Sequence, residues 1–132
     1  MSLRIEGQIF IFHFDADDDL LPKFYSDEVL RELPVRSKNG PIGLIATFGP
    51  NVRTVHTQTV SFWLERARDK NVNLRAISVV TTRLALRIAV KAFSQATGLF
   101  KPELQAQHFP DEPTARSWLE AQLKGATVAL KG

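Results

Sequence analysis

The stretch that decides the fold is Gly40-Pro-Ile-Gly-Leu-Ile-Ala-Thr-Phe-Gly-Pro-Asn-Val-Arg-Thr-Val-His56, with its continuation to Lys70. It predicts a buried strand over Ile42–Phe48, a turn at Gly49-Pro50-Asn51, and an amphipathic helix from about Val55 to Lys70. On one face of that helix, apolar residues recur at spacings of three and four: Val60, Trp63, Leu64 and Ala67. A buried strand that leads into a helix is the building unit of an α/β protein.

The rest of the chain predicts more units of this kind. A first β region comes before the opening stretch, with Gly7 as a turn within it, and a helix follows that begins at Pro22 or Ser26 and is closed by Pro34. After the stretch we expect two more strands, each followed by a helix. The expected segments are Leu3–Ile5, Gln8–Phe14, Leu74–Val80, the helix from Arg83 to Thr97, Leu104–Phe109, and a helix from Asp111 to Gly125.

This order predicts one α/β domain over residues 1–125, with residues 126–132 as a C-terminal tail. Its sheet has four to five strands, is mostly parallel, and carries helices packed on it. We expect Leu84, Ile88 and either Ala92 or Phe93 to be the core stripe of the helix over Arg83–Thr97.

The composition excludes several classes of protein. The chain has 132 residues, a net charge of +3 and no cysteine, so disulfides and thiolate chemistry are excluded. No run of apolar residues is long enough to span a membrane, and no secretory signal is expected. The basic residues are scattered over predicted helices, which argues against nucleic acid as a partner. We expect a cytoplasmic protein.

Two features of the N-terminal part could carry chemistry. Asp15 and Asp17 follow an apolar strand, as in phosphotransferases of the haloacid-dehalogenase type, where one Asp is the nucleophile and the second is an acid. The later paired carboxylates of that site are missing, so we expect these residues to cap the helix that follows. His13 lies in the strand, where we expect a hydrogen-bonded structural residue.

No other set of residues predicts catalysis. The serines lack the Gly-x-Ser-x-Gly setting of a hydrolase nucleophile. His13, His56 and His108 do not have metal-ligand spacing. We therefore expect a protein that is not an enzyme and that holds neither a metal nor a cofactor.

Arg83, Arg87 and Lys91 form a basic stripe at spacing four on the long predicted helix. The stripe is interpreted as a solvated face. The alternatives are contact with an acidic protein or with phospholipid headgroups, although the expected core position of Leu84 and Ile88 leaves it no exposed apolar edge.

The turn into the helix that ends near Lys70 carries the candidate site residues Arg53, Thr54, His56 and Thr57. Hydroxyl groups at a helix N-terminus can cap it, and a phosphate there is favoured by free N–H groups and the helix dipole. The pattern thus predicts a cap and leaves a phosphorylation switch as the alternative.

With these elements in this order, the chain resembles the STAS superfamily, the fold of anti-sigma-factor antagonists, and in particular its SpoIIAA-like branch. The resemblance covers Gly40 to Leu123 and includes the segments Asp69-Lys-Asn-Val-Asn-Leu74, Ala96-Thr-Gly-Leu-Phe100 and Ala106-Gln-His-Phe-Pro-Asp-Glu-Pro-Thr-Ala-Arg-Ser-Trp-Leu119. In that family the turn carries Asp-Ser-Ser, and its first Ser is phosphorylated by a partner kinase. Arg53-Thr54-Val55 stands at that tripeptide, so the resemblance places the phosphorylated residue at Thr54 and replaces the acidic neighbour with Arg53.

The resemblance implies a regulatory module that contacts a protein partner through Asn51–Lys70, with a phosphorylation site that has lost its acidic neighbour. The helix from Arg83 is long compared with that of the short antagonists. SpoIIAA-like relatives with longer helices resemble lipid carriers of the CRAL-TRIO type. The alternative implied function is therefore a carrier for a small apolar ligand or lipid. A homodimer is the default expectation for a domain of this size.

Overall fold

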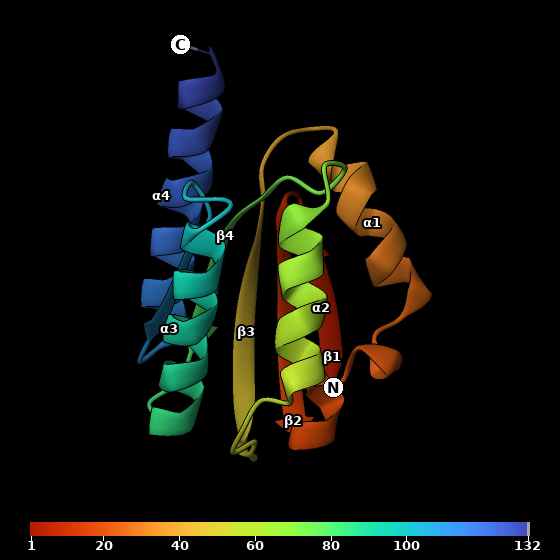
Figure 1. Cartoon of the computed structure of the whole chain (residues 1–132), viewed down its shortest axis with the longest axis vertical. Helices are drawn as coiled ribbons and strands as arrows, with labels where there is room; N and C mark the ends of the chain where they lie inside the picture. The colour runs from red at the N-terminus through yellow and green to blue at the C-terminus, as the bar shows by residue number, and fades with distance from the viewer. Residues whose placement is uncertain (132) are drawn as a thin grey trace.

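The computed structural model describes the backbone of residues 1–131 and the side chains of residues 1–125. In this part of the chain, strands and helices alternate after an initial pair of strands (Figure 1). The strands are β1 (Ser2–Glu6), β2 (Ile9–Ala16), β3 (Ile42–Asn51), β4 (Leu74–Val80) and β5 (Gln105–Phe109). The helices are α1 (Asp27–Ser37), α2 (Thr57–Arg68), α3 (Leu84–Gly98) and α4 (Glu112–Lys131), and the short 3-10 turns are η1 (Asp17–Leu20) and η2 (Pro22–Phe24).

The strands form one sheet in the order β1-β2-β3-β4-β5. Only β1 is antiparallel to its neighbour, and it is joined to β2 by a tight turn in which Gly7 has a φ of 59°. That backbone conformation favours glycine because it has no Cβ. The remaining neighbours are parallel, as crossover helices require. The prediction of a single α/β domain with a mostly parallel sheet is confirmed.

Helices cover both faces of the sheet, which explains why the central strands carry apolar residues on both sides. On β2, Phe10, Phe12 and Phe14 belong to the larger core, to which α1, α2 and α3 contribute. Ile9 and Ile11 alternate with these residues and join the smaller core under α4. The larger core is therefore aromatic at its centre, whereas the smaller one is aliphatic.

Several expected boundaries differ from those in the structure. Pro34 lies inside α1, which runs to Ser37. Within its last turn the Ser37 hydroxyl donates to the carbonyl of Leu33, and from outside the helix Gln8 donates to that of Arg36. Strand β3 continues through Gly49 and Pro50 to Asn51, which pairs with Ala16 of β2 beyond a bulge. The expected turn at Gly49-Pro50-Asn51 is present at the end of this strand, where the N–H of Val52 donates to the carbonyl of Gly49 at 3.2 Å.

Both ends of α2 and the end of α4 also differ. Helix α2 spans Thr57–Arg68, two residues shorter than expected at each end. Helix α4 continues past Gly125 to Lys131, because glycine in a helix is tolerated at a cost of only about 1 kcal/mol. The backbone up to Lys131 continues the helix, where a separate tail over residues 126–132 was expected. The side chains of this segment lie outside the described residues.

The expected core stripe of α3 is wrong in two of its members. Leu84 and Ile88 are exposed, at 63% and 58% of their full accessible surface. Phe93 is buried, as one of the two alternatives expected, and Leu86 and Thr97 are buried in place of the other two. Both stripes of this helix are apolar, so periodicity alone could not decide which of them faces the sheet.

Gly43 of β3 provides a test of how α4 packs on the sheet. A Cβ at this position would lie 2.7 Å from one Cδ of Leu119 and 3.3 Å from the other, and Leu119 is fully buried. We expect Gly43→Ala to lower the free energy of unfolding by about 1–3 kcal/mol through overpacking. In a Leu119→Ala background the same substitution should cost much less, because the opposing side chain is gone.

Urea denaturation of the four proteins in this double-mutant cycle measures the effect. Gly98→Ala is the matched control, because a Cβ there meets no atom within 4 Å. It should leave stability unchanged or raise it by up to about 1 kcal/mol. A Gly43→Ala protein as stable as the original would contradict the tight packing of Leu119 on β3.

Candidate functional site

The predicted site residues lie in the loop between β3 and α2, which is fastened to an acidic turn formed by Asp15–Asp19. The Asp17 carboxylate accepts hydrogen bonds from the backbone N–H groups of Arg53, at 2.6 Å, and Thr54, at 3.3 Å. The ring of His56 lies 3.2 Å from the carboxylate of Asp18. The structure therefore brings together two sequence features that stand nearly forty residues apart, as the separations of these pairs show.

The predicted threonine cap of α2 is wrong. His56 is the N-cap residue and its side chain forms no capping hydrogen bond. Thr54 and Thr57 are exposed, whereas Thr59 is buried and its hydroxyl donates to the carbonyl of Leu20 at 2.7 Å. The loop is therefore held by the acidic turn, through Asp17, and by the carbonyl of Leu20, and not by a threonine cap.

The acidic turn has a structural role throughout. The Asp19 carboxylate accepts hydrogen bonds from the N–H groups of Asp15 and Ala16, which hold the pKa of Asp19 below its usual range. Asp19 meets the expectation that the cluster caps a helix start, that of η1, whereas Asp17 accepts from the loop before α2 and Asp15 pairs with the N-terminal amino group. The expectation of a hydrogen-bonded His13 is confirmed, since its ring contacts Thr47 and Asp15. Among the described residues, no three His, Asp or Glu side chains gather as metal ligands would.

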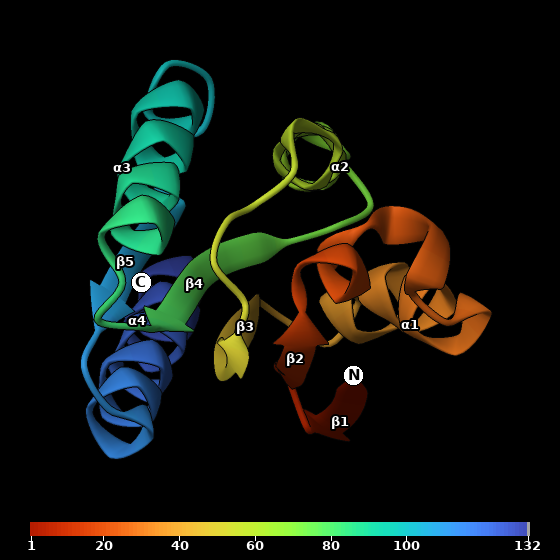
Figure 2. The same cartoon turned by 90° about the horizontal axis from the view of Figure 1, so that it is seen from below.

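Behind the loop lies an apolar pocket between the sheet and the helices α2 and α3, which stand side by side over the same face (Figures 1 and 2). Its volume is about 110 Å³. The floor comes from four strands: Phe12, Phe14, Leu44, Ala46, Phe48, Ile77, Val79 and Ala106. The walls come from α2, α3 and the connections before α2: Leu20, Tyr25, Val55, Thr59, Val60, Trp63, Leu86, Ala89, Val90 and Phe93.

Small side chains explain why the space is not filled. Ala46 and Ala106 lie on the floor, and Ala89 faces the pocket from α3. On the side of α2 the space is closed by aromatic rings, with Phe12 and Trp63 in an edge-to-face contact at 5.8 Å between ring centres. Protein interiors rarely leave voids much larger than a water molecule, so a hollow of this size is unusual for a packing defect.

The polar groups of the pocket are all engaged with one another. The Tyr25 hydroxyl donates to the carbonyl of Leu20 at 2.8 Å, and the same carbonyl accepts from Thr59. The indole N–H of Trp63 donates to the Tyr25 oxygen at 3.3 Å. No polar group is left to orient a polar ligand, so the pocket offers an apolar surface.

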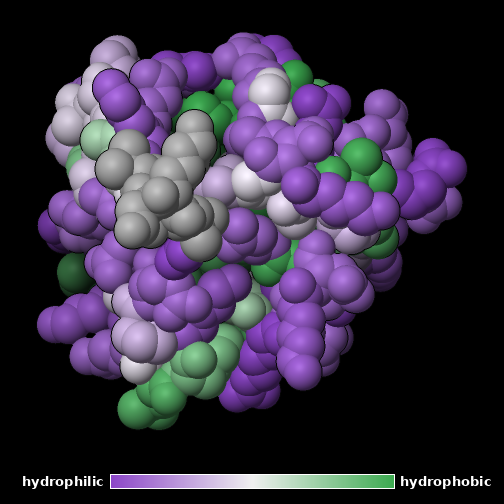
Figure 3. All heavy atoms as spheres, turned by 90° about the horizontal axis from the view of Figure 1, so that it is seen from above, coloured by the Kyte–Doolittle hydropathy of each residue, from purple (hydrophilic) through white to green (hydrophobic). Residues whose placement is uncertain are grey.

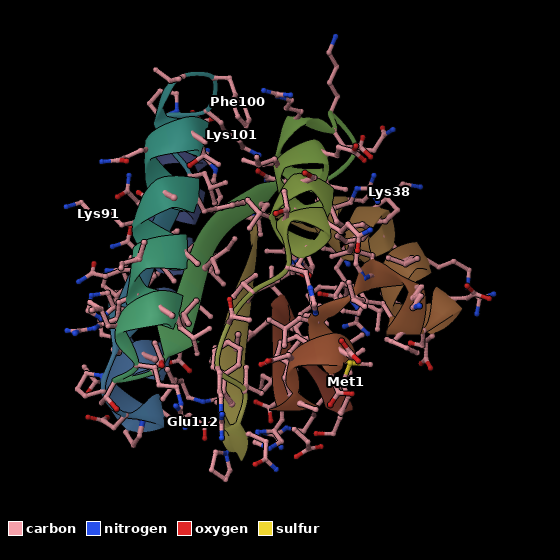
Figure 4. All side chains as sticks on the ribbon, turned by 60° about the horizontal axis from the view of Figure 1, so that its bottom comes forward. Met1, Lys38, Lys91, Phe100, Lys101 and Glu112 are labelled. Carbon is pink, nitrogen blue, oxygen red and sulfur yellow. The ribbon has the colours of Figure 1, made fainter. Side chains whose placement is uncertain are left out.

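A second hollow, at the end where α2 and α3 finish, is charged rather than apolar. Arg68, Arg75 and Lys101 line it together with Asp69 and Glu103. The pKa of Lys101 is lowered, mainly because its side chain is buried. Arg75 lowers this pKa further, and Glu103 partly offsets the shift. Figure 4 shows Phe100 and Lys101 at this end of α3. Basic side chains here offset the negative ends of the helix dipoles, which accounts for them without a ligand.

Sequence reasoning found the loop but not its tether or the pocket. The sequence around Asp17 predicts a catalytic acid or a cap. Nothing in it predicts hydrogen bonds from Arg53 and Thr54 to this carboxylate. The residues gave a partial signal for the pocket, since Phe12 and Phe14 share one face of β2. In the register of the sheet, Phe12 stands opposite Ala46, and that pairing becomes visible only once the strands are aligned.

Comparison with family models, with curated proteins and with solved structures found no match. The resemblance to the STAS superfamily therefore stays a prediction, made from the order of elements and from local motifs. No helix in the described part of the chain is long and apolar enough to cross a bilayer.

Tyr25, the only tyrosine of the chain, reports on the interior of the pocket. Burial raises its pKa from 10.0 to about 12, and the hydrogen bond from Trp63 offsets a part of this. The neutral phenol is thus favoured in the folded protein. Stability should be intact below pH 10 and fall as the pH rises from 10 to about 12, by up to about 1.4 kcal/mol per pH unit.

Absorbance titration of the phenolate, followed together with circular dichroism, measures this pKa directly. Tyr25→Phe is the control, because it should remove both the absorbance change and the stability loss in that pH range. Ionisation of the folded protein near pH 10 would contradict a buried, hydrogen-bonded Tyr25.

Proposed function

We propose that this chain is a binding module for a small apolar ligand, held in the pocket between the sheet, α2 and α3. The observation that carries the proposal is a pocket of about 110 Å³ with an apolar lining whose few polar groups are bonded among themselves. An engineered apolar cavity of about 150 Å³ stays dry and binds benzene. A group of that kind, an aromatic ring or a short alkyl chain, suits the space.

The electrostatics of the pocket support the same ligand class. A charged or strongly polar ligand would lose its hydration and find no partner, because the hydroxyls and the indole N–H have none to spare. An apolar ligand gives up nothing on entry and gains dispersion contacts with the rings of Phe12, Phe14 and Trp63. The proposal agrees with the carrier function that the resemblance to SpoIIAA-like relatives implied.

Filling the pocket from α3 tests the proposal. Ala89 lines the pocket, whereas Ala85 lies one turn away and is exposed. We expect Ala89→Phe to weaken the binding of toluene and of 1-hexanol by about tenfold or more, because the new ring occupies their space. Ala85→Phe adds the same ring to the same helix outside the pocket and should bind as the unaltered protein does.

Two measurements are suited to this comparison. Binding to the folded state raises the free energy of unfolding by about 2.7 kcal/mol at a ligand concentration of a hundred times Kd. Trp63 fluorescence should change as well, and Trp63→Phe identifies that signal against Trp118, which belongs to α4 and packs against the smaller core. Native mass spectrometry of freshly purified protein shows any ligand carried from the cell. No binding of either probe, and a clean ligand-free mass, would overturn the proposal.

A second candidate, the regulatory module, is favoured by the position of Val55. This residue lines the pocket and stands between Thr54 and His56, which are held by Asp17 and Asp18. A phosphate on Thr54 would be repelled by both carboxylates and would loosen the loop at the pocket wall. Phosphorylation would then control ligand entry or a protein contact made by Asn51–Lys70.

Thr54→Glu tests this candidate by adding a negative charge beside Asp17. We expect faster hydrogen exchange at the N–H groups of Arg53 and Thr54 and faster release of a bound ligand. Thr57→Glu is the matched control, since it adds the same charge in the first turn of α2, where the helix dipole favours it. Equal exchange in the two variants, together with equal capture of any partner by Thr54→Ala and Thr54→Glu, would contradict the switch.

A further inference from the structure

Helix α3 has two apolar faces, and only one of them is covered. Leu86 and Phe93 point into the pocket and the larger core. On the opposite side Leu84, Ile88 and Leu99 are exposed, at 63%, 58% and 90% of their full accessible surface. These are the three most exposed large apolar side chains in the described part of the chain. Ile88 follows Leu84 by about one helical turn, and Leu99, the C-cap residue of α3, follows Ile88 by about three turns, so the three lie on the same side of the helix and form one stripe.

On α3 itself, the charged residues that flank the stripe are all positive. Arg87 and Lys91 lie beside it, and the sequence from Leu84 to Gly98 contains no Asp or Glu. Neither residue forms an ion pair with a described side chain. Lys91 is exposed, and Arg87 is half-buried. Figure 4 shows Lys91 extending from α3 away from α2. The basic stripe seen in the sequence therefore does have the exposed apolar edge that it was expected to lack.

The shape of this surface limits what can cover it. Figure 2 shows α3 at the border of the molecule, with no other element on its side away from the sheet. Seen from above in Figure 3, a hydrophobic patch stands out from the mostly hydrophilic surface near the end of α3. The surface is the convex side of one helix. Partner helices are usually received in grooves, whereas a bilayer accepts a convex helix lying in its plane.

A second copy of the chain fits this surface poorly. In a twofold symmetric dimer the same face meets itself, which would bring the Arg87 and Lys91 side chains of both copies together. The face offers no carboxylate to offset that repulsion. An anionic bilayer satisfies both features, since its headgroups pair with the basic residues and its acyl boundary takes the apolar ones.

We propose that the outer face of α3, formed by Leu84, Ile88 and Leu99 with Arg87 and Lys91, docks on anionic membrane surfaces. This inference goes beyond the proposed ligand binding and does not depend on it, because the pocket is lined by the other face of the helix. Docking through α3 would also place the wall of the pocket next to a bilayer, where apolar ligands are concentrated.

Co-sedimentation with vesicles tests the docking on the intact chain. One set of vesicles is pure phosphatidylcholine and the other contains about one-third phosphatidylglycerol. We expect binding to the anionic vesicles at an ionic strength of about 0.1 M, and weaker binding as salt is added. The double variant Leu84→Ser, Ile88→Ser should bind about tenfold less tightly or worse. The double variant Arg87→Gln, Lys91→Gln should lose the preference for anionic vesicles.

The controls use the other parts of the molecule. Val35→Ser and Phe24→Ser each remove an exposed apolar side chain outside α3 and should leave vesicle binding unchanged. Ala89→Phe should also bind vesicles normally, so a failure of the pocket and a failure of the docking can be told apart. Since the chain has no cysteine, Ile88→Cys carries a single environment-sensitive fluorophore, which should move to an apolar environment on anionic vesicles. Phe24→Cys should give no such change.

Three results would overturn the docking. The first is an absence of binding to anionic vesicles at low salt. The second is equal binding by the original chain and by Leu84→Ser, Ile88→Ser. The third is a stable dimer, or a complex with an acidic protein, that is lost in the same double variant while vesicle binding is not. Unchanged unfolding midpoints would confirm that the variants fold.

Discussion

The structure depends on covering the aromatic face of the sheet. Phe10, Phe12 and Phe14 all emerge on one side of β2, and burying large rings is among the strongest contributions to folding. Three helices contribute to this core, whereas α4 alone covers the aliphatic face. On the side of α2, aromatic side chains such as Phe12 and Trp63 fill the space between helix and sheet. On the α3 side, alanines stand where larger groups would be needed for close packing, and the pocket is the result.

The position of Leu20 links the pocket with the loop at its border. Its carbonyl accepts from both Tyr25 and Thr59, and its side chain lines the pocket. It directly follows the acidic turn that holds Arg53 and Thr54. A change in the turn would therefore be felt at Val55 and Thr59, which gives the ligand-binding and regulatory proposals a common physical basis.

Helix α3 shows how far a sequence pattern can be taken. Its spacing correctly predicted a helix over nearly the observed residues, because apolar residues recur along it with the helical period. Two stripes satisfy that period, one containing Leu84 and Ile88 and the other containing Leu86 and Phe93. The side that faces the sheet depends on how the chain leaves β4 at Thr81, whose N–H is bonded to the carbonyl of Phe109. Phe109 lies in a strand nearly thirty residues further along the chain, so this hydrogen bond cannot be predicted from the local sequence.

The sequence by itself determined the α/β class, the five strands and the turn at Gly7. These follow from local periodicity and from backbone preferences of single residues. Tertiary structure alone decided the path of β3 through Pro50, the covered face of α3, the tether from Asp17 to the loop, and the pocket. Each of these depends on contacts between segments far apart in the chain, and on the volume left where small side chains meet across two layers. The fold therefore followed from the pattern of residues, whereas the candidate site needed the strands to be placed in register.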